Sequence, residues 1–383
     1  MSILFSLIKD IFSKKSDLRE IQAINPLSSA QVPFSVGYAG QPADTEQLLE
    51  IADSHRQAGR LDDAEAAYRA ILRAQPLNPE ANYNLGSLLV QSSQPQAALP
   101  LLQTALDMNS SNGQYRLNLA ACQVQLQAWD KAEALLHNAE EKGMELPLVT
   151  NLLCQIAAGK RFAGYNYLDW LNWLHLAVKP KTYVEIGVES GQSLQFSKCK
   201  SVGIDPAIQI FYSQESWVKL YKLTSDDFFV QHDLRKVLGA EFVDMAFIDG
   251  LHTFDQALKD FINIERHAHS ATVVVFHDIF PVTAITASRE RKSFFWLGDT
   301  WKVVLILKEM RPDLKICTLP AFPSGLTLVT GLNGNSKLLS QEVDQIIERW
   351  MKVELDSYLP EMDTHLNVIE NDTGAVSKFL RIV

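Results

Sequence analysis

The apolar positions of the N-terminal half follow helical spacing and recur at a fixed interval. Four sets of positions are each separated by 34 residues: Ala64, Ala98 and Ala132; Tyr68, Leu102 and Leu136; Ile51, Leu85 and Leu119; Ala52, Gly86 and Ala120. Small residues at such positions let two helices approach, and stacked helix pairs bury apolar faces that one pair cannot bury alone. A generic antiparallel helical bundle is the alternative, but it does not need one fixed period. We therefore predict an all-α repeat array over residues 45–160, with a closing helix over 147–158.

The pattern changes in the second half of the chain. Short apolar or β-branched runs occupy Thr182–Ile186, Lys200–Ile204, Phe242–Ile248 and Thr272–Phe276. The segments between them are long enough for helices, and this alternation is typical of a parallel sheet covered on both faces. A further helix over 300–311 and strands over 314–319 and 325–332 complete a predicted doubly wound, Rossmann-like α/β domain at 161–335. Within the extension at 336–383, we expect one helix over 336–358 that lies outside the core fold.

The first 44 residues form a separate N-terminal region. Residues 25–44 are rich in proline, glycine and serine, which marks a linker. Residues 1–15 are amphipathic, with their apolar side chains at helical spacing. An ordinary terminal helix that packs on its own chain is the favoured interpretation, and a helix that docks on a membrane surface or a partner is the alternative.

Composition narrows the classes of function. The 383 residues are 47% hydrophobic and 21% charged, as in ordinary globular proteins. A net charge of -10 argues against a broad phosphate-binding surface, so no nucleic acid partner is expected. The four cysteines lie far apart without metal-binding spacing, which suits reduced thiols. Because there is neither a long apolar run nor a cleavable leader pattern, we expect a cytoplasmic protein.

Glycines and acidic residues follow the first two predicted strands. Gly187 and Gly191 come after the first strand, where they permit a tight turn and let a ligand approach the start of the next helix. Asp205 lies 20 residues beyond Glu185, at the end of the second strand, where it is placed to accept the hydroxyls of an adenosine ribose. A glycine loop after the first strand and an acidic residue at the end of the second also occur in nicotinamide-dependent dehydrogenases. The G-x-x-x-G-x-S spacing and the acidic Glu189 inside the loop favour a cationic sulfonium ligand over a pyrophosphate.

Polar residues also follow the remaining strands of the predicted sheet. Ser225 and Asp226 stand where they could reach an adenine edge, although a plain helix N-terminus would explain the acidic residue equally well. Asp249 and His252 follow the 242–248 strand, and His277 and Asp278 follow the next strand. Open α/β sheets bind ligands at this carboxyl edge, so these four side chains are candidates for the reacting centre.

Together these motifs resemble a known family. The segments VEIGVESGQS, VGIDP, FIDGLHTFDQALKDF, VVVFHD and GDTWKV are similar, in this order, to class I O-methyltransferases that include macrocin O-methyltransferase-like and cephalosporin hydroxylase-like proteins. The resemblance covers about 165 of the 383 residues. The 34-residue period, with Pro76 where a unit ends, resembles the tetratricopeptide repeat. The chain is therefore expected to join these repeats to an S-adenosylmethionine-dependent methyltransferase.

The resemblance implies roles for individual residues. The methionine part of S-adenosyl-L-methionine would be held by Glu185, Gly187, Gly191 and Ser193, and the ribose by Asp205. The implied acceptor is a hydroxyl of a sugar or glycosylated small molecule, and the repeats would bind a protein or peptide. The alternative function is a repeat-based adaptor whose α/β domain is degenerate and non-catalytic.

Two mechanisms remain open at the reacting centre. In one, Asp249 and Asp278, with His277 assisting, hold a magnesium or manganese ion that binds the acceptor oxygen. In the other, His252 or His277 removes the hydroxyl proton, and an aspartate such as Asp249 orients the ring. Relatives that bind a cation often have two acidic residues at the end of the fifth strand, where this chain has His277-Asp278.

Purely structural roles are the alternative for some of these residues: a backbone-bonded histidine for His252 and a helix N-cap for Asp278. Candidate dry walls of the site, each with core packing as its alternative, are Phe254, Phe280, Phe294, Phe295 and Trp296.

Overall fold

The computed structural model describes residues 45–382 apart from 138, 140 and 142, and these residues divide into two compact units between Leu153 and Cys154. The amphipathic segment 1–15 and the linker 25–44 lie outside the described residues. In the described part of the chain, no helix is long and apolar enough to cross a membrane.

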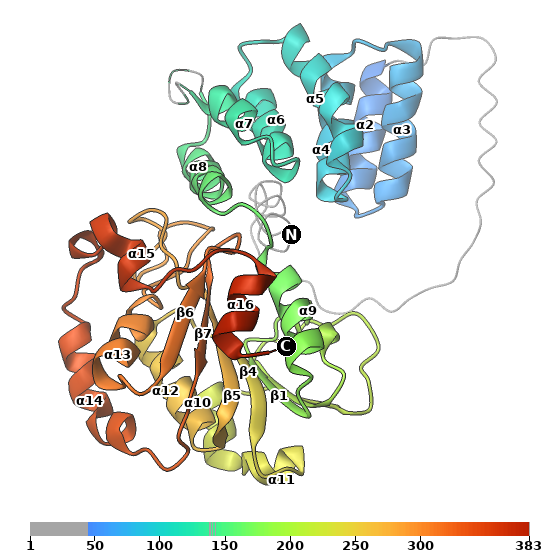
Figure 1. Cartoon of the computed structure of the whole chain (residues 1–383). Helices are drawn as coiled ribbons and strands as arrows, with labels where there is room; N and C mark the ends of the chain where they lie inside the picture. Colours follow the sequence, from blue (N-terminus) through green and yellow to red (C-terminus); the bar gives the residue numbers. More distant parts are fainter. Residues whose placement is uncertain (1–44, 138, 140, 142, 383) are drawn as a thin grey trace. The chain divides into compact units, whose positions relative to one another are not determined.

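The first unit consists of antiparallel helices that follow the predicted period. Its helices are α2 (Thr45–Gln57), α3 (Leu61–Ala74), α4 (Pro79–Gln91), α5 (Pro95–Met108), α6 (Gly113–Gln125), α7 (Trp129–Leu136) and the first half of α8 (Leu146–Arg161) (Figure 1). Ala64, Ala98 and Ala132 are fully buried. A Cβ atom at Gly86 would lie 2.7 Å from Cγ of Leu102, which explains why a small residue is needed there. The predicted helical repeats are confirmed.

The second unit is built on a seven-stranded sheet in the order β3-β2-β1-β4-β5-β7-β6. The strands are β1 (Thr182–Ile186), β2 (Lys200–Ile204), β3 (Val218–Tyr221), β4 (Val243–Ile248), β5 (Ala268–His277), β6 (Lys315–Leu319) and β7 (Leu326–Thr330). Neighbouring strands are parallel except at β7, which runs antiparallel to both β5 and β6. The predicted doubly wound α/β fold is confirmed.

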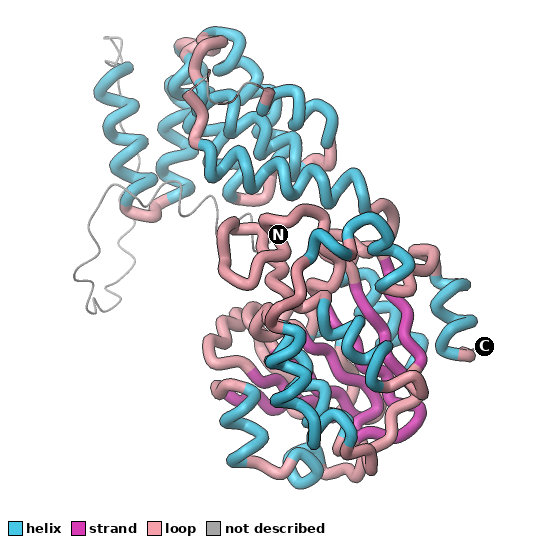
Figure 2. Tube along the Cα trace, turned by 90° about the vertical axis from the view of Figure 1, so that its left-hand side faces the viewer, coloured by secondary structure: helices cyan, strands magenta, loops and turns pink. Residues whose placement is uncertain are grey.

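Helices lie on both faces of the sheet (Figure 2). Alternating side chains of the strands build two apolar layers, one on each face. On β5, Val273 and Val275 pack with α9 (Tyr167–Val178) and α16 (Thr373–Leu380), whereas Val274 and Phe276 pack with the helices of the other face. Those helices include α10 (Ser225–Gln231), α11 (Leu234–Leu238), α12 (Phe254–Glu265), α13 (Lys302–Met310), α14 (Leu338–Trp350) and α15 (Met362–His365). Because both faces are covered, ligands reach the sheet at its edges.

Two expectations about helices are wrong. The segment after Gly191 forms only the single 3-10 turn Leu194–Phe196, so no helix begins there. The helix expected over 336–358 ends at Trp350, and its side chains at Leu339, Ile346 and Trp350 are buried in the core of the sheet domain. These three apolar residues lie at helical spacing on one side of α14, which explains why this helix packs on the domain rather than outside it.

Candidate active site

The predicted site residues meet at the carboxyl edge of the sheet. The strand order reverses between β1 and β4, and this switch point is where open α/β sheets form a ligand crevice. Gly187 directly follows β1, Asp205 follows β2 and Asp249 follows β4. His277 ends β5, and Asp278 comes next. One edge of the sheet therefore carries all five of these residues.

Glu185 is a fully buried carboxyl group on β1. Its two oxygens accept hydrogen bonds from the hydroxyls of Tyr183, at 2.7 Å, and Ser193, at 2.6 Å. Burial raises the pKa of Glu185 to about 8, and these two hydroxyls only partly offset the effect. The hydroxyl of Ser193 thus donates to Glu185 rather than directly to a ligand. A cationic ligand close to the carboxyl group of Glu185 would favour the ionised form of that group.

The loop after β1 is held in a conformation that needs glycine. Gly187 has φ +91°, and a Cβ atom there would lie 1.9 Å from the carbonyl oxygen of Asp249. The requirement at Gly187 is thus the close approach of two backbone segments. Gly191 has φ +73°, and its carbonyl accepts a hydrogen bond of 2.6 Å from the hydroxyl of Tyr212.

Asp205 is fixed by backbone amides. One carboxylate oxygen accepts from the N–H of Ala207 at 2.6 Å, and the other accepts from the N–H of Glu189 at 3.0 Å. A carboxylate has about four lone-pair positions, so each oxygen can still accept a hydroxyl of a ligand. Asp205 is only partly buried, so its remaining acceptor positions are open to a ligand.

Ser225 and Asp226 occupy the first turn of α10, which is capped by the side chain of Thr224. A helix N-terminus, which the sequence offered as the alternative explanation for Asp226, is therefore present. In addition, Nε2 of Gln256 donates to Ser225 at 3.1 Å and to Asp226 at 3.0 Å, which links these residues to α12. Gln256 also bonds to the buried carboxyl of Asp260, whose pKa is raised to about 6 by burial.

The reacting centre contains two carboxylates, each paired with an imidazole. Nε2 of His252 lies 2.9 Å from the carboxylate of Asp278, and Nδ1 of His277 lies 3.1 Å from that of Asp249. Burial alone would lower the pKa of His252, but the charge of Asp278 and its hydrogen bond raise it to about 9. Burial would raise the pKa of Asp278, yet the charges of the two imidazoles hold it well below its usual range.

The two histidines differ in access. The ring of His277 is 8% exposed, stacks at 4.4 Å on Tyr167, and has its Nε2 3.2 Å from Oγ of Ser324. His252 is 27% exposed, and its Nδ1–H donates to the carbonyl of Trp296 at 3.0 Å. Both nitrogens of each ring have partners inside the protein, but His252 is the more exposed ring and is therefore the histidine that a ligand can approach.

The backbone around His252 is unusually constrained. Gly298 has φ +63°, and a Cβ atom there would lie 1.6 Å from the carbonyl oxygen of His252. Asp278, which is not a glycine, adopts φ +55°. No helix begins at Asp278 in the described residues, so its alternative role as an N-cap is wrong. His252 lies just before α12 and bonds to the backbone carbonyl of Trp296, as its structural alternative predicted. It also forms the ion pair with Asp278.

Most of the expected apolar walls belong to the core. Phe254, Phe280 and Phe295 are almost completely buried and pack with the helices of one sheet face, whereas Phe294 is partly exposed. Trp296 stacks on His252 with 5.3 Å between ring centroids. Of these five aromatic residues, Trp296 is therefore the one that stacks on a histidine of the reacting centre.

A cation could be held by a different trio from the one predicted. Among the described residues, donor atoms of Asp249, His252 and Asp278 all lie within 4.8 Å of one another. His252 takes the place expected for His277. This set of two carboxylates and one imidazole would suit manganese or zinc better than magnesium. However, Nε2 of His252 donates a hydrogen bond to the carboxylate of Asp278. A metal ion could bind this nitrogen only after its proton had been lost.

Two residues of this site carried no signal in the sequence. Tyr167 begins α9 and Ser324 lies between β6 and β7, both far in the chain from the predicted strand ends. Gln256 lies inside the segment FIDGLHTFDQALKDF, but on the helix rather than at the strand end. Tyr183 alternates with Glu185 along β1, so a strand pattern places the two side chains on one face. That alternation is the one cue that could have found a partner of the buried carboxyl.

Comparisons with known proteins agree with this architecture. Two tetratricopeptide repeat models match residues 49–93 and 89–156, and a methyltransferase domain model matches residues 184–279. No curated protein matches the chain. The chain thus joins segments that match tetratricopeptide repeats to a following segment that matches a methyltransferase domain.

Solved structures with similar parts include a methyltransferase and an O-methyltransferase. The S-adenosylhomocysteine-bound methyltransferase PaMTH1 of Podospora anserina is 17% identical, with a TM-score of 0.34, over 46% of this chain and 82% of that chain. The O-methyltransferase of Bacillus cereus in complex with S-adenosylhomocysteine is 13% identical, with a TM-score of 0.32, over 46% and 87%. The secretion chaperone SycD of Yersinia enterocolitica is 23% identical, with a TM-score of 0.27, over 30% and 82%. These values are too low to support an argument about function.

Proposed function

We propose that the α/β unit transfers a methyl group from S-adenosyl-L-methionine to a hydroxyl of a sugar or glycosylated small molecule. The observation that carries the proposal is the arrangement of Glu185, the glycine loop and Asp205 at the switch point of the sheet. The narrower likeness to macrocin O-methyltransferase-like proteins remains a prediction, as does the identity of the acceptor.

The cofactor assignment is supported by the end of β1. A dinucleotide needs helix N-terminal amides that face its pyrophosphate. Here the chain forms only a 3-10 turn at Leu194–Phe196, while Glu185 and Glu189 supply carboxyl groups. This chemistry favours a cationic methionyl group over a phosphate, with Asp205 accepting the ribose hydroxyls and Ser225 and Asp226 lying near the adenine.

For proton removal, we assign the role of general base to His252. It is the more exposed of the two histidines, and Trp296 fixes its Nδ1–H so that Nε2 faces Asp278 and the site. With a pKa of about 9, the ring must lose its own proton before it can accept one. We therefore expect kcat/KM to rise from neutral pH towards about pH 9. His277 would instead position Asp249.

The paired charges favour the mechanism without a metal ion. Two close carboxylates need a cation or hydrogen-bond donors between them, and the imidazoles of His252 and His277 are such donors. The measurement is methyl transfer from tritiated S-adenosylmethionine to a panel of glycosides after exhaustive chelation. Restoration of activity only by added magnesium or manganese would overturn this assignment and assign Asp249, His252 and Asp278 as ligands.

Cofactor binding by the full chain tests the proposal most directly. In calorimetry, S-adenosylhomocysteine and S-adenosylmethionine should bind and NAD should not. Asp205→Ala should weaken binding by roughly 1.5 to 3 kcal/mol, because charge-assisted bonds to the ribose are lost. A Glu241→Ala variant, altered at an exposed carboxyl group just before β4, is the control and should bind normally. Normal binding by Asp205→Ala would contradict the cofactor site.

The repeats suggest a protein or peptide partner, since tetratricopeptide arrays present extended surfaces for such ligands. The adaptor alternative, in which the α/β unit is degenerate, predicts that neither S-adenosylmethionine nor S-adenosylhomocysteine binds. The same calorimetric experiment therefore separates the two functions.

A further inference from the structure

A cavity lies at the amino edge of the sheet, opposite the edge that carries the candidate active site. Its volume is ≈ 630 Å³, within the usual range of small-molecule pockets. The lining comes from the residues that precede or begin β1, β4, β5 and β6, from the end of β7, and from the C-terminal ends of α9 and α16. Four cationic side chains contribute to the lining: Lys179, Lys181, Lys315 and Arg381.

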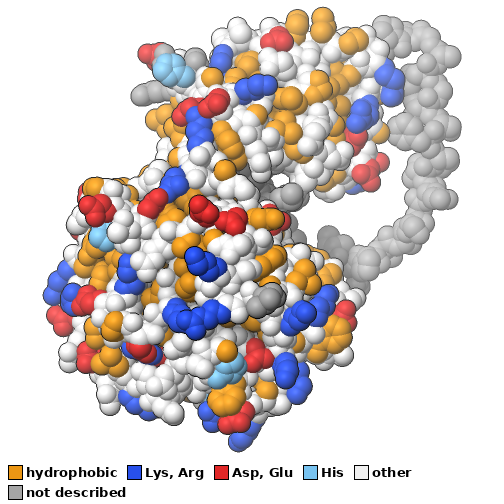
Figure 3. Space-filling view, in the orientation of Figure 1, with side chains coloured by type: hydrophobic (Ala, Val, Ile, Leu, Met, Phe, Trp, Pro, Cys, Tyr) orange, Lys and Arg blue, Asp and Glu red, His pale blue; other side chains and the backbone are white. Residues whose placement is uncertain are grey.

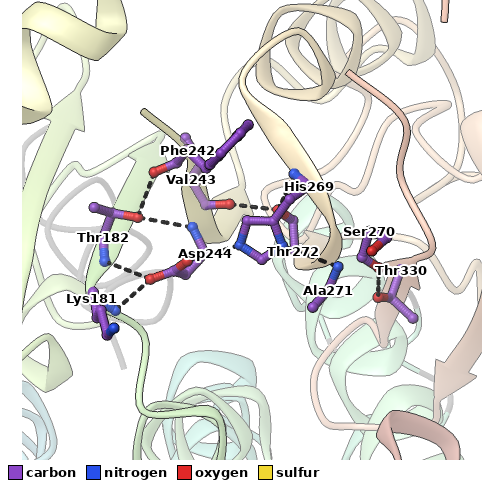
Figure 4. Close-up of polar contacts among 10 residues, drawn as sticks. All are labelled: Lys181, Thr182, Phe242, Val243, Asp244, His269, Ser270, Ala271, Thr272 and Thr330. Carbon is purple, nitrogen blue, oxygen red and sulfur yellow. Dashed lines mark hydrogen bonds and ion pairs between the residues drawn. The ribbon is translucent and has the colours of Figure 1, made fainter. Parts of the chain in front are cut away.

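The single acidic residue of the lining is already satisfied. The carboxylate of Asp244 accepts from the backbone N–H groups of Lys181, at 2.6 Å, and Thr182, at 3.2 Å (Figure 4). Its other oxygen lies 3.0 Å from Nε2 of His269. None of the four cationic groups forms an ion pair with any residue that the structure describes.

The helix ends at the cavity offset only part of this positive charge. Lys179 caps the C-terminus of α9 and Arg381 caps that of α16, and each helix end carries about half a negative charge. Together with Asp244, the two ends offset about two of the four positive charges. Among the described residues of the lining, an excess of about two positive charges remains. Figure 3 shows Lys and Arg side chains gathered on the face that carries α16, although the chain has a net charge of -10.

We propose that this cavity binds the phosphate group of a small phosphate ester. Such a group carries about 1.5 to 2 negative charges at neutral pH, which matches the excess of positive charge. The hydroxyl of Ser270 adds a hydrogen-bond donor, and Val178, Phe379 and Leu380 offer apolar contacts to the organic part. The site lies at the other edge of the sheet from the proposed methyl-transfer centre and does not depend on it.

Calorimetry on the full chain tests the proposal, with phenyl phosphate and inorganic phosphate as probes at matched ionic strength. Both should bind, phenyl phosphate more tightly because its ring meets the apolar wall, and added salt should weaken both. Lys315→Glu should weaken binding about tenfold or more, since it changes the local charge by two units. The control is Lys352→Glu, a charge reversal at an exposed side chain outside the lining, which should change binding less than about twofold.

Further arms locate the site and the source of the phosphate. Arg381→Gln should also weaken binding, and saturation with S-adenosylhomocysteine should leave it unchanged, since the two ligands occupy different edges. Vesicles of phosphatidylcholine, with and without phosphatidic acid, distinguish a lipid headgroup from a soluble ester. Binding that needs phosphatidic acid and is lost in Lys315→Glu would keep the site and assign the phosphate to a lipid. Absence of binding to every probe, or equal losses in Lys315→Glu and Lys352→Glu, would overturn the proposal.

Discussion

Each edge of the sheet holds an imidazole–carboxylate pair of almost the same length. His252 and Asp278 lie 2.9 Å apart at the carboxyl edge, and His269 and Asp244 lie 3.0 Å apart at the amino edge. The side chain of Asp278 is 9% exposed, whereas that of Asp244 is 27% exposed and also accepts two backbone amides. Although the two distances are almost equal, the carboxylate of Asp278 therefore depends more on its histidine than the carboxylate of Asp244 does.

The comparison shows how each edge accommodates charge. At the carboxyl edge, the carboxylates of Asp249 and Asp278 pair with two imidazoles and are largely shielded from water, and left-handed backbone at Asp278 and Gly298 holds the site in place. At the amino edge, cationic groups remain exposed and have no ionic partner among the described residues. The first arrangement suits chemistry that needs fixed groups, and the second suits the binding of a ligand that brings its own charge.

The largest expected effect tests the constrained backbone of the carboxyl edge. Gly298→Ala should lower the free energy of unfolding by more than about 3 kcal/mol, because the new Cβ meets the carbonyl of His252 in a left-handed conformation. Urea unfolding followed by tryptophan fluorescence measures this, since every tryptophan except Trp129 lies in the α/β unit.

A matched glycine provides the control for that experiment. Gly239 has φ +60°, close to the φ +63° of Gly298, but a Cβ there would meet only the flexible end of Lys200 at 3.7 Å. Gly239→Ala should therefore cost about 1 kcal/mol, the cost of the conformation alone. Equal losses in the two variants would mean that the contact between Gly298 and His252 does not constrain the site.

The next effect separates the two imidazole–carboxylate pairs directly. His252→Ala should lower the free energy of unfolding at neutral pH by about 3 kcal/mol, because it leaves the buried carboxylate of Asp278 without its main partner. His269→Ala should cost about 1 kcal/mol or less, since Asp244 keeps its two amide donors. If both variants lost the same stability, burial would not distinguish the edges.

The sequence predicted the two edges to different extents. The 34-residue period and the alternating strands located the repeats, the sheet and the carboxyl-edge motifs, because those signals are local and periodic. The hydrogen bonds of His252 to Trp296 and of His277 to Ser324 could not be predicted in this way, since these partners reach the site from loops distant in the chain. The amino-edge cavity also left no motif, because its cationic residues lie on separate elements and meet only in the fold.

A smaller effect concerns the pH dependence of the carboxyl edge. Burial raises the pKa of Glu185 from 4.5 to about 8, so the folded state binds its proton more tightly and stability falls as the pH rises from about 4.5 to 8. The raised pKa of His252 adds stability that is present below about pH 6.5 and is lost as the pH rises through about 9. Both changes have the same sign, so the unfolding free energy should be lower at pH 9 than at pH 6.

Substitution separates the share of Glu185 from that of His252. Glu185→Gln should flatten the dependence between about pH 4.5 and 8 and leave the loss at higher pH, because His252 still titrates there. Glu290→Gln, at an exposed position, should leave the curve unchanged. A curve for Glu185→Gln that is parallel to that of the unsubstituted protein would contradict the raised pKa of Glu185.

The smallest effect concerns the unpaired charges of the amino edge. Without phosphate, Lys315→Gln should leave the free energy of unfolding unchanged or raise it by up to about 0.5 kcal/mol, because it relieves repulsion from Lys181 and Arg381 without breaking an ion pair. The gain should shrink in high salt, which screens exposed charges. Arg349→Gln is the contrasting control, since its guanidinium is paired with Glu309, and it should not raise stability. A clear loss of stability in Lys315→Gln would show that this lysine has a structural partner, and the contrast between the two edges would then fail.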